Sequence, residues 1–204
     1  MTRDTFIRLL NEQPKQNDNI PFTKVNIHIS LRGDIVKYCF GLNKEVQSIT
    51  KSQVDFSPAS FQIPHLTIEM GYVKTERDFK NLMNDISDFA KELSAFEVVP
   101  QKPYLSKPKR NYVFVDTDKD ELILTIKEKA KEKFKEWIVP LEWDVSKATP
   151  HITVGYITDN YDQVEELIED YTTGPNWIAN TIEISYTGSR GSCIGTIRSF
   201  EFGN

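Results

Sequence analysis

A short string containing histidine and threonine occurs twice in this chain of 204 residues. The two copies are Pro64-His65-Leu66-Thr67-Ile68 and Pro150-His151-Ile152-Thr153-Val154, which lie 86 positions apart and both run on to a Gly-Tyr pair. They hold two of the three histidines in the chain. Imidazole has an ordinary pKa of about 6.5, so one ring of a pair can be neutral while the other is protonated near neutral pH. The repeat therefore predicts general acid–base chemistry, of the kind that acts on a phosphodiester.

Strand geometry would place the polar side chains of each copy on one face. Because side chains alternate along a strand, the predicted histidine face carries His65, Thr67, Glu69 and Gly71 in the first copy and His151, Thr153 and Gly155 in the second. The opposite face is largely apolar and should be buried, which also places Tyr72 and Tyr156 away from the histidines. The threonine hydroxyls could then donate hydrogen bonds to phosphate oxygens as charge builds on them.

Hydrophobic periodicity predicts the elements that position these two strands. The predicted strands cover residues 25–31, 64–73, 96–99, 111–115, 150–157, 181–187 and 193–202. The predicted helices cover residues 3–12, 34–50, 76–94, 119–137 and 160–171. Residues 13–20 are a polar linker, residues 51–63 are a loop, and residues 188–191 form a glycine-bearing turn between the last two strands.

The order of these elements looks like a duplicated unit. Each half contains a strand, a helix, a motif strand, a further helix and a further strand. We therefore expect an α+β fold with two pseudo-symmetric lobes, each a small, mostly antiparallel sheet with outer helices, and a groove between them. Residues 1–20 would be an N-terminal extension, and residues 21–204 one bilobal domain.

Composition narrows the class of protein. The net charge of −5 argues against a surface that coats duplex nucleic acid, and favours a small ligand. No apolar run reaches the length of a membrane span, and the first residues lack an export pattern. Cys39 and Cys193 have no metal-ligand spacing, and we expect reduced thiols in a cytoplasmic protein. Three histidines without clustered carboxylates make a poor metal site, so no metal or other cofactor is expected.

Four further residues are candidates for binding substrate. Tyr112 and Phe114 would face the groove if Val113 and Val115 face the helices, and could stack on a base. His28 lies on the polar face of the strand 25–31 and could line the groove. Arg198 interrupts an apolar face and could bind phosphate, or could simply extend to solvent. Glu69, which could orient an imidazole, is given no role.

The paired motifs resemble those of the 2H phosphoesterase superfamily, the LigT-like proteins, which carry one H-x-[ST] motif in each lobe. The resemblance rests on His65-Leu66-Thr67 and His151-Ile152-Thr153 and extends over nearly the whole chain after residue 20. It implies metal-independent action on a cyclic phosphate or a 2′,5′-linked nucleotide, with these two histidines and two threonines as catalytic residues. The implied partner is a nucleotide or short oligonucleotide; neither a membrane nor a stable protein partner is implied.

Several alternatives remain open at this level. Water could open a cyclic phosphate, or a ribose 3′-hydroxyl could attack a 2′,5′ linkage and leave a 2′,3′-cyclic end. Possible substrates include 2′,5′-oligoadenylate, cyclic oligonucleotides, RNA ends and ADP-ribose cyclic phosphate. A nucleotide- or RNA-binding module without turnover is the competing interpretation, and RNA ligation ranks lower because no nucleotidyl-lysine motif is visible. Catalysis requires both imidazoles to reach one phosphate, so the positions of the two rings distinguish an enzyme from a binding module.

Overall fold

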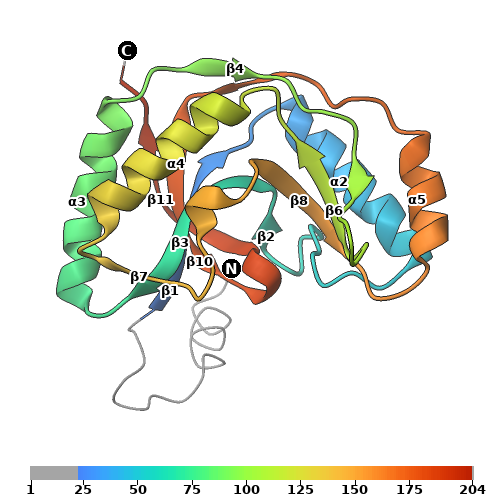
Figure 1. The fold of residues 1–204 in the computed structure, drawn as a ribbon, viewed down its shortest axis with the longest axis horizontal. Coiled ribbons are helices and arrows are strands. Elements are labelled where there is room, and N and C mark those ends of the chain that lie inside the picture. The colour runs from blue at the N-terminus through green and yellow to red at the C-terminus, as the bar shows by residue number, and fades with distance from the viewer. Residues whose placement is uncertain (1–22, 204) are drawn as a thin grey trace.

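The fold is built on one nine-stranded antiparallel sheet, seen in a computed structural model that describes residues 23–203 (Figure 1). The strand order is β2-β11-β10-β1-β3-β8-β6-β5, and β7 also pairs with β3. The strands of this sheet are β1 (Thr23–Ser30), β2 (Gln62–Ile63), β3 (His65–Val73), β5 (Tyr104–Leu105), β6 (Tyr112–Asp116), β7 (Ile138–Pro140), β8 (His151–Tyr156), β10 (Thr181–Thr187) and β11 (Cys193–Glu201). The helices are α2 (Asp34–Ile49), α3 (Glu76–Lys91), α4 (Asp120–Phe134) and α5 (Tyr161–Glu169), with short 3₁₀ helices η1 (Val145–Lys147) and η2 (Ser189–Gly191).

The two motif strands, β3 and β8, lie at the junction of the two halves of this sheet. They are joined by a single residue pair, Leu66 with Ile152. The sequence predicts two sheets side by side, and the structure joins them edge to edge through this pair. The α+β class is confirmed.

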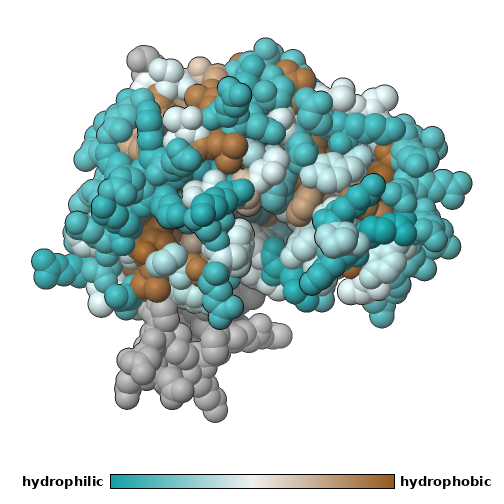
Figure 2. All heavy atoms as spheres, viewed as in Figure 1, coloured by the Kyte–Doolittle hydropathy of each residue, from teal (hydrophilic) through white to brown (hydrophobic). Residues whose placement is uncertain are grey.

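The helices divide between the two halves. In Figure 1, α3 and α4 lie together over the β3 half, and α2 and α5 over the β8 half. The periodic apolar residues predicted from the sequence are buried on these helices, among them Leu82 and Phe89 on α3 and Ile126 and Phe134 on α4. The face of the molecule seen in Figure 2 is mostly hydrophilic, with hydrophobic side chains in small patches, and the buried apolar residues form one core cluster.

The shortest strands are absent from the sequence prediction. β2, β5, β7 and β9 (Trp177–Ala179) are two or three residues long, so alternation within them carries no signal. β4 (Phe96–Val98) pairs with β9 in a separate two-stranded sheet. The predicted helix 3–12 and linker 13–20 lie outside the described residues. Within residues 23–203, no helix is long and apolar enough to cross a membrane.

The two motif strands, β3 and β8, have the same register with the strands on the sides away from the junction, β1 and β6. Five pairs of the ladder between β1 and β3 recur between β6 and β8, with both partners of each pair shifted by 86 residues. The equivalent pairs are Asn26–Met70 and Tyr112–Tyr156, His28–Thr67 and Phe114–Thr153, and Ser30–His65 and Asp116–His151. The duplication seen in two short strings therefore extends to whole pairs of strands.

A β-bulge in each motif strand overturns part of the predicted alternation. The ladders skip Ile68 in β3 and Val154 in β8, each three residues after the histidine. One extra residue reverses the faces beyond it. Met70 and Tyr156 therefore return to the histidine face. Gly155 turns to the core, where an added Cβ would lie 3.2 Å from a methyl group of Val113.

Candidate active site

Both His-x-Thr pairs line one cavity of about 420 Å³ at the junction of β3 and β8. The structure thus brings together all four residues predicted to be catalytic. The cavity is also lined by residues from both halves of the sheet, from α4 and from the loops around η1 and η2, among them Lys24, Met70, Tyr112, Phe114, Lys127, Trp143 and Arg190.

The two histidine rings are held in the same way. His65 Nδ1 lies 2.9 Å from the carbonyl oxygen of Ile63, and His151 Nδ1 lies 2.7 Å from that of Thr149. Each ring therefore donates its Nδ1 proton to the carbonyl two residues earlier in the chain. This contact fixes the ring orientation and leaves Nε2 as the nitrogen available for proton transfer.

Burial favours the neutral form of both rings. It lowers the pKa of His151 to about 4, with smaller contributions in the same direction from the charges of Lys127 and His65. Burial also lowers the pKa of His65, and the backbone at Ile63 and Gly191, which favours the protonated form of the ring, acts in the opposite direction. A bound phosphate would favour the protonated form of a nearby ring, because an opposite charge stabilises it.

Asn26 on β1 organises the His65 side of the cavity, a role that the sequence analysis missed. Its Nδ2 lies 3.1 Å from Thr67 Oγ1, 3.3 Å from the Gly191 carbonyl and 3.4 Å from His65 Nε2. Its Oδ1 is buried without a hydrogen-bond partner among the described residues. Rotation of the carboxamide would present an oxygen instead of an N–H to His65, so Asn26 can serve a neutral or a protonated ring. Its place on the polar face of the first strand was the available signal.

Aromatic rings line the His151 side. The ring of Phe114 lies 4.0 Å from that of His151, and Tyr112 stacks on Phe114 at 5.2 Å. These two residues face the cavity as the alternation of β6 predicts. Tyr156, predicted to lie on the opposite face, packs edge-on against Tyr112 at 4.8 Å because of the bulge at Val154.

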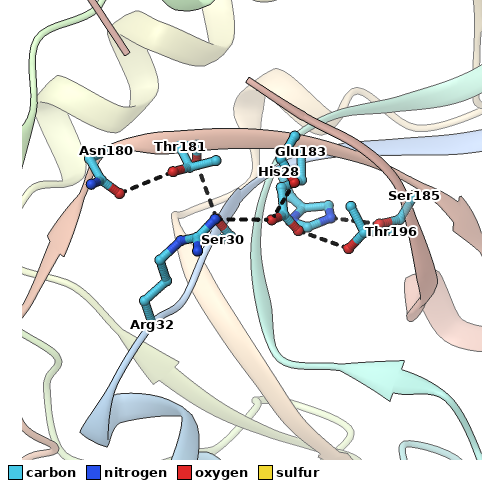
Figure 3. A network of polar contacts seen from close by, with 9 residues as sticks. His28, Ser30, Arg32, Asn180, Thr181, Glu183, Ser185 and Thr196 are labelled. Atoms are coloured by element: carbon cyan, nitrogen blue, oxygen red, sulfur yellow. Dashed lines mark hydrogen bonds and ion pairs between the residues drawn. The ribbon is translucent and has the colours of Figure 1, made fainter. Parts of the chain in front are cut away.

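His28 is completely buried and does not line the cavity. Its ring lies 5.2 Å from that of His65, and its Nε2 lies 2.9 Å from Ser185 Oγ. Figure 3 shows it beside a polar network in which Glu183 accepts a hydrogen bond from Thr196 and pairs with Arg32. The prediction that His28 touches substrate is not supported, because it lies behind His65.

Arg198 and Glu69 also lie away from the cavity lining. Arg198 is exposed on β11, with its guanidinium 5.3 Å from the ring of Phe200, so solvent and this ring satisfy it. Glu69 lies beyond the bulge, buried beside Lys127 and Lys131 of α4, and its carboxylate accepts a hydrogen bond from the Met70 amide. The proposed contact of Arg198 with phosphate is therefore not supported, and Glu69 faces away from His65.

Three cations that the sequence analysis did not single out line the cavity: Lys24, Lys127 and Arg190. Arg190 lies in the turn at η2 with a left-handed backbone (φ 55°), and its guanidinium lies 4.2 Å from the Tyr156 ring. Its position in a glycine-flanked turn was a usable signal. The cavity is therefore basic although the chain is acidic overall.

A protein-bound metal has no evident ligand set here. Among residues 23–203, no group of three or more histidine, cysteine, aspartate or glutamate side chains is arranged to hold a metal ion. The two cysteines are buried and unpaired with each other. The polar groups that line the cavity include two imidazoles, the threonine hydroxyls, two ammonium groups and the Arg190 guanidinium.

Known proteins share this fold. TT0787 of Thermus thermophilus matches with a TM-score of 0.65 at 14% identity, over 89% of this chain and 100% of that one. LigT of E. coli in complex with 3′-AMP matches with a TM-score of 0.63 at 9% identity, over 89% and 99%. Usb1 of Kluyveromyces marxianus matches with a TM-score of 0.52 at 10% identity, over 88% and 98%. No curated protein matches the sequence.

The structural matches, at 9–14% identity, show the fold, and a sequence model of a protein family shows the family. The model of the 2′-5′ RNA ligase superfamily matches residues 41–185, which include both His-x-Thr motifs and most of the cavity lining. The chain belongs to the 2′-5′ RNA ligase superfamily, the 2H phosphoesterases.

Proposed function

We propose that this protein is a metal-independent phosphodiesterase that acts on a cyclic phosphate or a 2′,5′-linked nucleotide. The observation that carries the proposal is the convergence of His65, Thr67, His151 and Thr153 on one cavity, with both Nδ1 atoms fixed by backbone carbonyls. Because the cavity takes residues from both halves of the sheet, we propose residues 21–204 as one functional domain.

The reaction needs one proton removed and one supplied. One Nε2 takes the proton of the attacking hydroxyl, either water or a ribose 3′-hydroxyl, as its oxygen forms a bond to phosphorus. The bond from phosphorus to the leaving oxygen breaks, and that oxygen takes a proton from the other Nε2. Thr67 and Thr153 donate hydrogen bonds to the non-bridging oxygens as negative charge increases there.

The lining of the cavity favours a nucleotide over a longer or simpler phosphodiester. A volume of about 420 Å³ suits a ligand of nucleotide size. Phe114 and Tyr112 offer ring faces next to His151 on which a base could stack, and the three lining cations favour a phosphate. The complexes of the structurally similar LigT with 3′-AMP and with ATP agree with a nucleotide ligand.

A substrate panel tests the proposal. The purified protein would be incubated with 2′,5′- and 3′,5′-linked dinucleotides, 2′,3′-cyclic nucleotides, 2′,5′-oligoadenylate, cyclic oligonucleotides and ADP-ribose cyclic phosphate. Mass spectrometry of the products separates hydrolysis, which adds one water, from transesterification, which leaves a cyclic phosphate. Turnover of a cyclic or 2′,5′-linked member supports the proposal. Binding that persists in His65→Ala and His151→Ala, with no turnover by the wild type, would favour the binding module.

A further inference from the structure

Lys127 is a charged side chain in an unusual place. It lies on α4, only 2% exposed, and its ammonium group donates a 2.7 Å hydrogen bond to the carbonyl of Ala148. The next carbonyl along the chain, that of Thr149, accepts the Nδ1 proton of His151. Two consecutive peptide groups therefore hold the Lys127 ammonium and the His151 ring, and both side chains line the cavity.

The surroundings of His65 differ from those of His151. The Asn26 carboxamide and the carbonyls of Ile63 and Gly191 surround His65, and these can accept hydrogen bonds from a protonated ring once the carboxamide rotates. Lys127 instead places a full positive charge near His151, and like charges disfavour a second cation. The two half-sites share their register but differ in which ring is better suited to be protonated before the reaction begins.

We propose that Lys127 is a positioning residue that sets the roles of the two histidines: its ammonium group makes His151 the general base and leaves proton donation to His65. This inference rests on the proposed phosphodiesterase function and adds which ring takes the proton. His151 Nε2 removes the proton from the attacking hydroxyl, the new bond to phosphorus forms, and the leaving oxygen takes the proton of His65 Nε2.

The other charged groups near this pair do not reverse the argument. Asp116 on β6 pairs with His151 in the ladder, but burial raises the pKa of its carboxyl, which accepts a hydrogen bond from Tyr104. Glu69 on β3, Asp120 on α4 and Asp144 before η1 act on Lys127 and keep it protonated. Burial lowers the pKa of Lys127 to about 8, so the ammonium is fully charged over the range in which His151 titrates.

Histidine titration by NMR tests the electrostatic link without substrate. In Lys127→Met, the His151 ring should titrate roughly half to one pH unit higher than in the wild type, because a nearby cation has been removed. Lys127→Arg should restore the wild-type value. Lys131→Met is the matched control, since Lys131 is an exposed lysine one turn along the same helix that pairs with Asp144. A folded Lys127→Met protein with unchanged His151 titration would overturn the proposal.

A leaving-group experiment tests whether His65 is the general acid and His151 the general base. It does not alter Lys127, so it can be done even if Lys127→Met does not fold. Adenylyl-(2′,5′)-adenosine is compared with the 2′-(p-nitrophenyl phosphate) of adenosine, whose leaving group departs without a proton. The activated substrate should restore turnover of His65→Ala by at least tenfold and leave His151→Ala impaired. The reverse pattern would overturn the assignment. If the wild type turns over neither compound nor any panel member, the proposed function fails, while the NMR titration still decides the effect of Lys127.

Discussion

The ring of Phe114 packs 4.0 Å from the ring of His151, at the position where the ring of His28 packs 5.2 Å from His65 in the other half of the molecule. Phe114 and His28 are equivalent residues, 86 positions apart and paired with Thr153 and Thr67. The half-site with Phe114 is aromatic and half-buried, whereas the half-site with His28 is polar and closed. The two half-sites have therefore diverged: one presents aromatic ring faces beside its histidine, and the other encloses its histidine among polar side chains.

This asymmetry predicts that the aromatic half-site binds the base. Phe114→Leu and Tyr112→Leu should each raise KM, because loss of stacking on a base costs about 1–3 kcal/mol. Steady-state kinetics on the best member of the substrate panel would measure the effect. Phe40→Leu is the control, since Phe40 is an exposed aromatic residue on α2 outside the cavity lining. An unchanged KM in both cavity variants would show that the base binds elsewhere.

The threonines should act in the chemical step. Thr67→Val and Thr153→Val keep the shape of the side chain but remove the hydroxyl, so kcat should fall on the order of 10²-fold with little change in KM. Thr125→Val, on the exposed face of α4, should leave kcat unchanged. A rise in KM at constant kcat would indicate that the hydroxyls bind substrate and transition state equally.

The buried His28 predicts a loss of stability in acid. Its pKa lies well below the ordinary value of about 6.5, mainly through burial. The folded protein therefore binds fewer protons than the unfolded chain below that pH, and stability is complete above about pH 6.5 and falls as the pH is lowered toward the folded pKa. His28→Gln, which keeps a polar group that can hydrogen-bond to Ser185, should lose less stability between pH 7.5 and pH 5 in urea unfolding. The same pH dependence in both proteins would show that His28 is not buried and neutral.

Much of this arrangement could be predicted from the sequence. Hydrophobic patterns predicted which face of each element is buried, as in the strand at residues 25–31 and the helix at residues 76–94. Such a pattern can be recognised within the element itself. The duplicated strings indicated the pseudo-symmetry. Tyr112 and Phe114 face the groove as the alternation predicts, because β6 itself contains no extra residue and the bulge lies in β8. Periodicity predicts which residues are buried where a strand or helix is regular and contains no bulge.

The remaining features depend on pairing between distant segments. The bulges at Ile68 and Val154 exist only against β1 and β6, so simple alternation put Tyr156 on the wrong face. Nothing in the predicted helix 119–137 distinguishes Lys127 from its other lysines, because its contact with Ala148 depends on the packing of α4 against η1. The alternation of residues 25–31 placed His28 toward the groove, because nothing in its own strand shows that Ser185 of β10 lies beside it.

Metal removal should leave activity intact. The proton transfers are assigned to imidazoles, and residues 23–203 contain no cluster of metal-ligating side chains. Turnover in EDTA should therefore stay within about twofold of the untreated protein, since general acid–base catalysis needs no metal. A large loss in EDTA that added Mg²⁺ or Zn²⁺ reverses would contradict this prediction.

The central claim is that both imidazoles act on one phosphate. It is tested most directly by turnover of the preferred cyclic or 2′,5′-linked substrate by the wild type, His65→Ala and His151→Ala, measured from pH 4 to 9. The account predicts a bell-shaped profile for the wild type and a loss on the order of 10²- to 10⁴-fold in each variant, since each removes one proton-transfer group. Activity within tenfold of the wild type in either folded variant would contradict it.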